Sequence, residues 1–207
     1  MRVLLVGATG TIGRAIGAAL GEPHELITAA RGRADEQVDL GDPDSIRAMY
    51  ARVGQVDAVV SAAGQAAFKP LAELDDSDFT LSLGNKLMGQ VNLVRYGLDS
   101  VADGGSFTLT SGILAQRPEP GTAAISLVNA GLEGFVRAAA LEVPRGIRIN
   151  VVSPPWVTET LRALGRPLDG GLPADIVARA YLHSIEGELS GQVLHVEGSD
   201  TPAMALA

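Results

Sequence analysis

Three glycines at three-residue intervals directly follow the first apolar run of the chain, Arg2–Val6. In this position one glycine can make a tight turn, a second lets the backbone approach a pyrophosphate, and a third lets a helix pack closely on the sheet. The start of that helix offers unpaired N–H groups to phosphates. The motif predicts dinucleotide binding, and a merely structural glycine turn is the alternative. The loop residues expected at the cofactor are Gly7, Thr9, Gly10, Ile12 and Gly13.

An arginine follows the second apolar run, Glu25–Ala30, where proteins that bind NAD place an acidic residue for the ribose 2′-hydroxyl. The planar guanidinium of Arg31 can pair with a 2′-phosphate through two hydrogen bonds. We therefore expect NADP as the cofactor, with NAD as the less favoured choice. A solvated surface arginine is the alternative interpretation.

Composition excludes several classes of protein. The 207 residues include no cysteine, so disulfides and thiolate sites are absent, and His24, His183 and His195 show no metal-ligand spacing. The net charge of −8 argues against a nucleic-acid binder. No apolar run reaches the roughly 20 residues that would span a bilayer, and the first run is too short for a signal peptide. We expect a cytoplasmic protein without metal, nucleic-acid or membrane partners.

Short apolar runs alternate with longer amphipathic segments along the whole chain. The runs are Arg2–Val6, Glu25–Ala30, Val56–Ser61, Gly105–Thr110, Ile147–Val152 and Gln192–Val196, with a weaker one at Glu36–Val38. The helical segments are Thr11–Leu20, Pro43–Arg52, Ser77–Val101, Thr122–Glu142 and Pro173–Ser184. This alternation predicts an α/β fold: a doubly wound, Rossmann-type parallel sheet of about seven strands with helices on both faces. One domain spanning residues 1–207 is expected.

These features resemble the short-chain dehydrogenase/reductase family over nearly the whole chain. Val38-Asp39-Leu40 is similar to the family's pair that holds the adenine, and Ser61-Ala62-Ala63-Gly64 to its segment after the fourth strand. The stretch 147–154 and Thr158 are similar to the segment that flanks the nicotinamide, and 191–198 to the last strand. The resemblance implies further cofactor-binding residues: Asp39, Leu40, Ala62, Gly64, Pro154 and Thr158.

The resemblance fails at two positions where the family carries its chemistry. Family members have a Tyr that exchanges the proton and a Lys four residues later that lowers the pKa of that Tyr. By alignment these positions hold Ile125 and Asn129, and neither residue can perform those tasks. The family's serine is matched by Ser111, which we expect to orient a substrate oxygen. Tyr96 and Tyr181 lie in other segments and are not assumed to substitute.

Lys86 stands where the family places an Asn on the long fourth helix, and Asn85 lies one residue away on a different side of that helix. Lys86 is one of only two lysines. A cation turned towards Ser111 could act as general acid or base, whereas an ordinary exposed lysine is the alternative. The Lys-Leu-x-Gly-Gln segment here is similar to that of a branch of short family members.

The predicted substrate loop, around residues 155–172, is shorter than in many family members. We expect an open or shallow pocket, or one completed by a neighbouring subunit. Trp156 is expected either as a pocket wall or as a packing residue. Arg117 and Glu119 either reach a substrate or are solvated loop charges.

Three functions remain open from the sequence. The first is an NADP-dependent oxidoreductase for a small carbonyl or alcohol substrate, with Ser111 and Lys86 as the catalytic residues. The second is an NADP-binding sensor or regulatory protein without turnover, and the third is a non-redox isomerase, dehydratase or cyclase in the same cleft. Because 77–101 and 122–142 resemble the family's pairing helices, a homodimer or homotetramer is expected.

Overall fold

A single eight-stranded sheet forms the centre of the molecule, in the order β3-β2-β1-β4-β5-β6-β7-β8. The computed structural model describes residues 1–197 and 203–204. The strands are β1 (Arg2–Val6), β2 (Glu25–Ala30), β3 (Glu36–Gln37), β4 (Val56–Ser61), β5 (Val101–Thr110), β6 (Arg148–Ser153), β7 (Val193–His195) and β8 (Ala203–Met204). Every neighbouring pair is parallel except β7 and β8.

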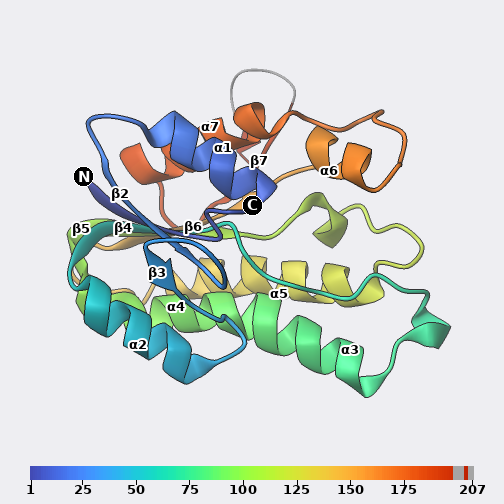
Figure 1. Cartoon of the computed structure of the whole chain (residues 1–207), viewed down its shortest axis with the longest axis horizontal. Coiled ribbons are helices and arrows are strands. Elements are labelled where there is room, and N and C mark those ends of the chain that lie inside the picture. The colour runs from blue at the N-terminus through green and yellow to red at the C-terminus, as the bar shows by residue number, and fades with distance from the viewer. Residues whose placement is uncertain (198–202, 205–207) are drawn as a thin grey trace.

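Helices cover both faces of the sheet (Figure 1). The α-helices are α1 (Thr11–Leu20), α2 (Pro43–Val53), α3 (Asp76–Leu81), α4 (Gly89–Gly97), α5 (Ala123–Ala139), α6 (Thr158–Ala163) and α7 (Ala174–Glu186). A π-helix, η2 (Ser82–Met88), joins α3 to α4, and short 3₁₀ turns are η1 (Leu71–Glu73), η3 (Leu98–Ser100) and η4 (Ile113–Ala115). Helices α1 and α7 pack on one face, and α2, α4 and α5 on the other.

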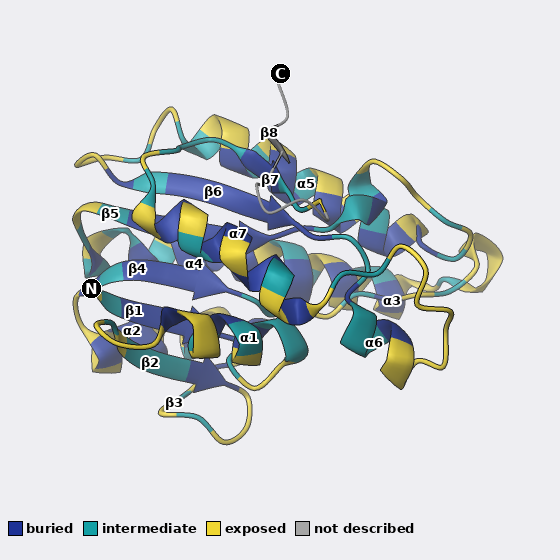
Figure 2. Cartoon of the chain, turned by 90° about the horizontal axis from the view of Figure 1, so that it is seen from above, coloured by how far each residue is buried: buried dark blue, intermediate teal, exposed yellow. Residues whose placement is uncertain are grey.

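The central strands are buried on both faces, as Figure 2 shows for β4, β5 and β6. Val3, Leu4 and Leu5 of β1 each have no exposed surface, because alternate residues point into the two separate cores. A strand covered on both faces reads as a continuous apolar run. The predicted doubly wound α/β fold is therefore confirmed.

Four details differ from the prediction. The stretch 77–101 is not one helix, because η2 interrupts it and Val101 already belongs to β5. Strand β5 begins at Val101, four residues before the predicted start at Gly105, and this added part pairs irregularly with β4. The interval 155–172 contains a helix, α6. An antiparallel strand, β8, extends the sheet beyond seven strands.

The topology places the site at one edge of the sheet. Strand β1 pairs with β2 on one side and β4 on the other, so successive connections leave β1 and β4 in opposite directions. Ligands of such sheets bind outside the carboxyl ends of the strands at this switch point. No helix in the described ranges is long and apolar enough to cross a membrane.

Candidate functional site: a two-part cleft at the carboxyl edge of the sheet

The glycine loop after β1 has no room for side chains. A Cβ on Gly13 would lie 2.0 Å from the Gly7 carbonyl oxygen, so only glycine lets α1 approach the loop this closely. Gly7 has a φ of 89°, and a Cβ there would lie 2.6 Å from the Ala62 carbonyl oxygen. The two glycines thus hold the ends of β1, β4 and α1 together.

The first turn of α1 is open to a ligand. Its N-cap is Gly10, which provides no side-chain hydrogen bond to the helix start. The unpaired N–H groups and the partial positive charge of the helix therefore face the space beyond the loop. A compact loop in front of an uncapped helix fits a pyrophosphate.

A cavity of about 330 Å³ lies beside this loop. Arg31 and Leu40 line it, together with five further residues expected at the cofactor: Gly7, Thr9, Gly10, Ala62 and Gly64. Val38 and Leu40 supply apolar walls, which suit the face of an adenine. The Arg31 Nη1 donates to Gln65 Oε1 at 3.1 Å, so the guanidinium is turned along the cavity wall.

A second cavity of about 280 Å³ adjoins the first. The residues Ala62, Ala63 and Gly64 line both, so the two form one cleft across the end of β4. The expected site residues at the second cavity are Ile12, Lys86, Ser111 and Pro154, joined by Ile125, Asn129 and Trp156. A two-part cleft of this form suits an elongated dinucleotide and leaves room for a small substrate at one end.

Three residues expected at the cofactor line neither cavity. Gly13 has the packing role described above. Asp39 is exposed, and its carboxylate accepts a hydrogen bond from the Gly41 N–H at 2.8 Å. Thr158 begins α6, and its N–H donates to the Leu172 carbonyl. Asp39 and Thr158 thus order the loops beside the cleft.

The π-helix η2 presents two neighbouring residues to the two cavities. Asn85 lines the first cavity and Lys86 the second, and both are buried. The wider turn of a π-helix separates adjacent side chains by a smaller angle than the roughly 100° of an α-helix. The Asn85 Oδ1 accepts from the Gln65 N–H at 2.8 Å, which fixes the chain after β4. Sequence analysis assigned no site role to Asn85.

Lys86 is held as a buried cation at the base of the second cavity. It is 8% exposed, and its Nζ lies 3.5 Å from the Thr110 carbonyl oxygen. Burial lowers the pKa of Lys86 to about 8, because the ammonium loses hydration. Gln90, one turn later, exchanges two hydrogen bonds with the Thr110 backbone, each 2.9 Å long. These bonds anchor the helix against the end of β5.

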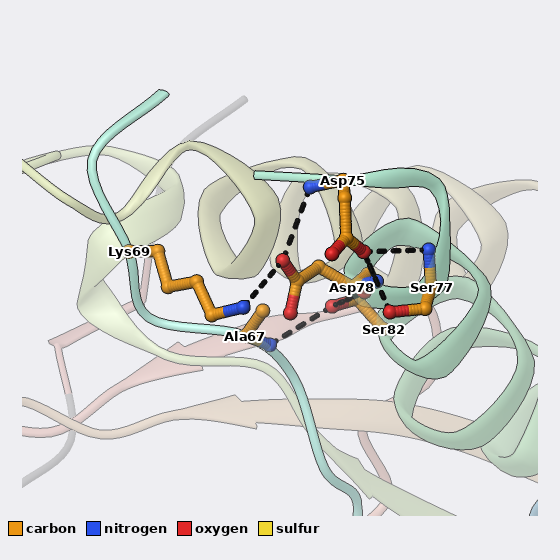
Figure 3. Close-up of polar contacts among 6 residues, drawn as sticks. All are labelled: Ala67, Lys69, Asp75, Ser77, Asp78 and Ser82. Carbon is orange, nitrogen blue, oxygen red and sulfur yellow. Dashed lines mark hydrogen bonds and ion pairs between the residues drawn. The ribbon is translucent and has the colours of Figure 1, made fainter. Parts of the chain in front are cut away.

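The other lysine has a structural role (Figure 3). The Lys69 Nζ lies 2.8 Å from Asp78 Oδ2, and this contact raises the pKa of Lys69. Asp75 and Asp78 form a capping box at the start of α3. The Ser82 hydroxyl accepts from the Ala67 N–H at 2.9 Å. Together these bonds tie the segment 65–70 to the helix.

Ser111 and Lys86 both line the second cavity, but the Ser111 hydroxyl donates its proton to a residue that does not line it. The Ser111 Oγ donates to Glu133 Oε1 at 3.0 Å and lies 3.5 Å from the Val152 carbonyl oxygen. The other carboxylate oxygen of Glu133 accepts from Gln116 Nε2 at 2.5 Å. Ser111 therefore offers acceptor lone pairs to the cavity. Glu133, a buried carboxylate on α5, was not predicted as a site residue, because only its contact with Ser111 connects it to the site.

No tyrosine of the described residues lines the second cavity. Tyr181 is fully buried, and its hydroxyl lies 2.6 Å from Thr110 Oγ1. Burial raises the pKa of Tyr181 well above its usual value. Asn129 lines the cavity, and its Nδ2 donates to the Gly112 carbonyl at 3.3 Å. No cluster of three metal-ligating side chains occurs among the described residues.

Of the remaining charged and aromatic candidates, Trp156 and Glu119 contact each other beside the substrate loop 155–172. Trp156 lines the second cavity, and its Nε1 donates to Glu119 Oε1 at 3.0 Å. Glu119 also pairs with Arg166 at 2.9 Å, so it is occupied within the protein. Neither Glu119 nor Arg117 lines the cleft, and neither do His183 and His195.

The doubly wound sheet, the glycine loop and the cleft define the Rossmann class of dinucleotide-binding proteins. The family model described as "Enoyl-(Acyl carrier protein) reductase" matches residues 14–187. The chain belongs to the short-chain dehydrogenase/reductase family. This family assignment agrees with the resemblance noted in the sequence.

Several proteins with names or structures are similar to this chain. Hydroxynaphthalene reductase arp2 of Aspergillus fumigatus is 33% identical over 58% of this chain, which matches only 46% of that protein. The 3-oxoacyl-[acyl-carrier-protein] reductase of Rattus norvegicus is 31% identical over 72% of this chain and 68% of its own length. The crystal structure of lin1944 from Listeria innocua has 44% identity and a TM-score of 0.92, covering 95% of this chain and 100% of that one.

A further neighbour shares the fold alone. It is a small-chain dehydrogenase whose crystal structure is a complex with NADPH. Its identity is 24% and its TM-score 0.83, with coverage of 97% of this chain and 98% of that chain.

Proposed function

We propose that this protein is an NADP-dependent reductase of small carbonyl compounds, in which Lys86 replaces the family's tyrosine as the proton donor. The observation that carries the proposal is the burial of this lysine at the substrate end of the cleft, beside Ser111. A general acid works best when its pKa lies near the working pH. The pKa of Lys86, lowered to about 8, meets that condition.

The cofactor is proposed to lie along the whole cleft. The α1 N-terminus and the glycine loop would hold the pyrophosphate, and Arg31 would hold the 2′-phosphate. Asn129 occupies the family's lysine position, and its buried Oδ1 has no hydrogen-bond partner in the structure. This acceptor suits a ribose hydroxyl. When bound, the dihydronicotinamide supplies the hydride.

The protein itself must supply one proton to the substrate oxygen. As the carbonyl carbon gains the hydride, its oxygen takes a proton from the Lys86 ammonium, which leaves a neutral amine. Because the Ser111 proton is engaged by Glu133, Ser111 can accept a hydrogen bond from Lys86 or from the product hydroxyl. The Gln90 bonds to Thr110 keep the helix that carries Lys86 in register with Ser111.

Steady-state oxidation of NADPH with a panel of aldehydes and ketones tests the proposal. We expect turnover with at least one class of carbonyl and formation of the matching alcohol. NADPH binding without oxidation by any member of the panel would overturn the assignment.

One observation favours a second candidate function. The hydroxyl of Ser111 points to Glu133, and Ile125 offers no proton, so most of the family's proton machinery is missing. An NADP-binding sensor would need the cleft but no proton donor. In that case NADP(H) binds tightly while alcohol formation is absent.

We also propose that the protein is a homodimer or homotetramer. Leu83 and Met88 of η2 and Leu127 of α5 are exposed, although all three are large and apolar. The helices that carry them pack against each other, so exposed apolar side chains lie on two neighbouring elements. Light scattering at micromolar concentration tests this proposal, and a monomer would contradict it.

A further inference from the structure

The second cavity combines a few polar side chains with a largely apolar surface. Its polar side chains are Lys86, Thr110, Ser111 and Asn129 beside the ends of the strands, and Thr160 on α6. Most of the other lining side chains are apolar or aromatic: Ala66, Phe68, Ile113, Ile125, Trp156 and Val157. Lys86 is the one charged residue among the described residues that line this cavity. A substrate that shares this cavity with the nicotinamide therefore meets one cation and a largely apolar surface.

The aromatic part of the wall is held in place on both sides. Phe68 belongs to the segment that Ser82 and Lys69 tie to the helix, as Figure 3 shows. Its ring and that of Trp156 have centroids 6.0 Å apart and are tilted by 44°. The two rings are neighbours at this spacing, and because they are tilted, a flat ligand can stack on one ring while its edge meets the other.

Glu119 and Arg166 hold the Trp156 side chain. Glu119 accepts from Trp156 Nε1 at 3.0 Å and from the Arg166 guanidinium at 2.9 Å. The same guanidinium lies 4.5 Å from the centre of the indole ring. The acid and the base pair with each other and hold the indole, and neither of them lines the cavity.

We propose that this cavity selects uncharged carbonyl compounds with a flat aromatic body, which lies along the Phe68 and Trp156 rings while its oxygen reaches Lys86. The inference rests on the proposed reductase function and names its substrate class. With the carbonyl oxygen at Lys86, a carboxylate or phosphate on the body would lose its hydration without gaining a second cation from the lining. The cavity has a volume of about 280 Å³ and also lies at the nicotinamide end of the proposed cofactor position, so the substrate must be small.

The protein contains a built-in reporter, because Trp156 is its single tryptophan. Emission from the protein loaded with NADP⁺ can be followed while a carbonyl compound is added, and the oxidised cofactor prevents reduction. Benzaldehyde and para-carboxybenzaldehyde share a ring and an aldehyde and differ by one charge. Calorimetric titration of the same pair gives the dissociation constants independently of the ultraviolet absorption of the two compounds.

We expect benzaldehyde to perturb the Trp156 emission and to bind at least about tenfold more tightly than the carboxylate, because the charge is left unpaired. Phe68→Ala should weaken benzaldehyde binding by about fivefold through loss of aromatic contact. Leu141→Ala is the matched control, since Leu141 is 88% exposed and lines neither cavity. Equal or tighter binding of the carboxylate would overturn the proposal, as would Phe68→Ala without effect.

The two proposals fail in different ways. If benzaldehyde binds at Trp156 but is never reduced with NADPH, the cavity binds aromatic carbonyl compounds as proposed, and the proposed reductase function is wrong. If aliphatic or carboxylate-bearing carbonyls are reduced efficiently and benzaldehyde neither binds nor reacts, the function stands and the substrate class falls.

Discussion

The two halves of the cleft are built by different means. In the first half, the backbone forms most of the site. There is no room for a Cβ at Gly7 or Gly13, and α1 offers its uncapped N–H groups. In the second half, side chains decide what is possible, and Ile125 and Asn129 line the cavity at the positions that the sequence resemblance assigns to the family's Tyr and Lys. Backbone sites tolerate almost no change of residue, whereas side-chain sites can change their chemistry on an unchanged frame.

This difference shows where new function can arise. Lys86 enters the second half through the π-helix, while the adjacent Asn85 still serves the first half. The frame proposed to bind the dinucleotide is thereby separated from the group proposed to donate the proton. Substitutions in each half should therefore affect different measured quantities.

The largest effect is expected from Lys86→Met, which keeps the stem and removes the charge. Turnover in NADPH-dependent carbonyl reduction should fall by about a hundredfold or more, because the general acid is lost. The dissociation constant of NADPH should change little. Steady-state kinetics and fluorescence titration measure the two quantities.

Arg47→Met is the control for that variant. It removes an exposed cation that pairs with Asp44 and lines neither cavity, so turnover should be nearly retained. Lys86→Met should be at least as stable to heat as the wild type, because a desolvated ammonium is removed. Full activity of Lys86→Met would remove this lysine from the mechanism.

The pH dependence of the same reaction should follow the ammonium of Lys86. Its pKa in the folded protein is about 8, so the acid form decreases above that pH. We expect kcat/KM for reduction to fall by about tenfold per pH unit beyond the pKa, and to be level below it. A profile that stays flat to pH 10 would assign the proton to another source.

In the first half, Arg31→Ala should remove the preference for NADP(H) over NAD(H). The loss of a charge-assisted, two-bond contact is worth about tenfold or more in the ratio of the two dissociation constants. Calorimetric titration of both cofactors gives that ratio. Arg33→Ala, an exposed neighbour that does not line the cavity, is the control. An unchanged ratio in Arg31→Ala would exclude a role in discrimination.

A smaller effect is expected from Glu133→Gln, which keeps the shape of the side chain and removes its charge. The hydrogen bond from Ser111 becomes weaker, so its hydroxyl can turn to a substrate oxygen and lower KM by about fivefold. The same substitution in a Ser111→Ala background should leave KM unchanged relative to Ser111→Ala alone. An equal shift in both backgrounds would indicate a structural role for Glu133.

Patterns that depend on the backbone could be predicted from the sequence. The continuous apolar runs gave the parallel sheet, and the glycine spacing gave the loop, because each requires a particular residue type at a fixed interval. The start of β5 could not be predicted, since Gly104 and Gly105 sit in an irregular strand. The bounds of α5 and α7 differ by a few residues from the expected ones, as helix ends commonly do.

The second half of the cleft could be predicted only in part. Alignment placed Ser111 and Lys86 near each other, and both line the same cavity. The angle between Asn85 and Lys86 was not predictable, because a helical wheel assumes an α-helix where the chain forms a π-helix. Glu133 acts through a contact between α5 and the end of β5, and no local pattern encodes such a contact.

Arg31 already has a hydrogen-bond partner before any phosphate arrives. Its Nη1 donates to Gln65 Oε1, and the backbone N–H of Gln65 donates to Asn85, the neighbour of Lys86. A phosphate that uses Nη1 would compete with that amide, whereas the other guanidinium donors remain available to it. One glutamine thus joins Arg31 to Asn85, the neighbour of the proposed proton donor, through two hydrogen bonds.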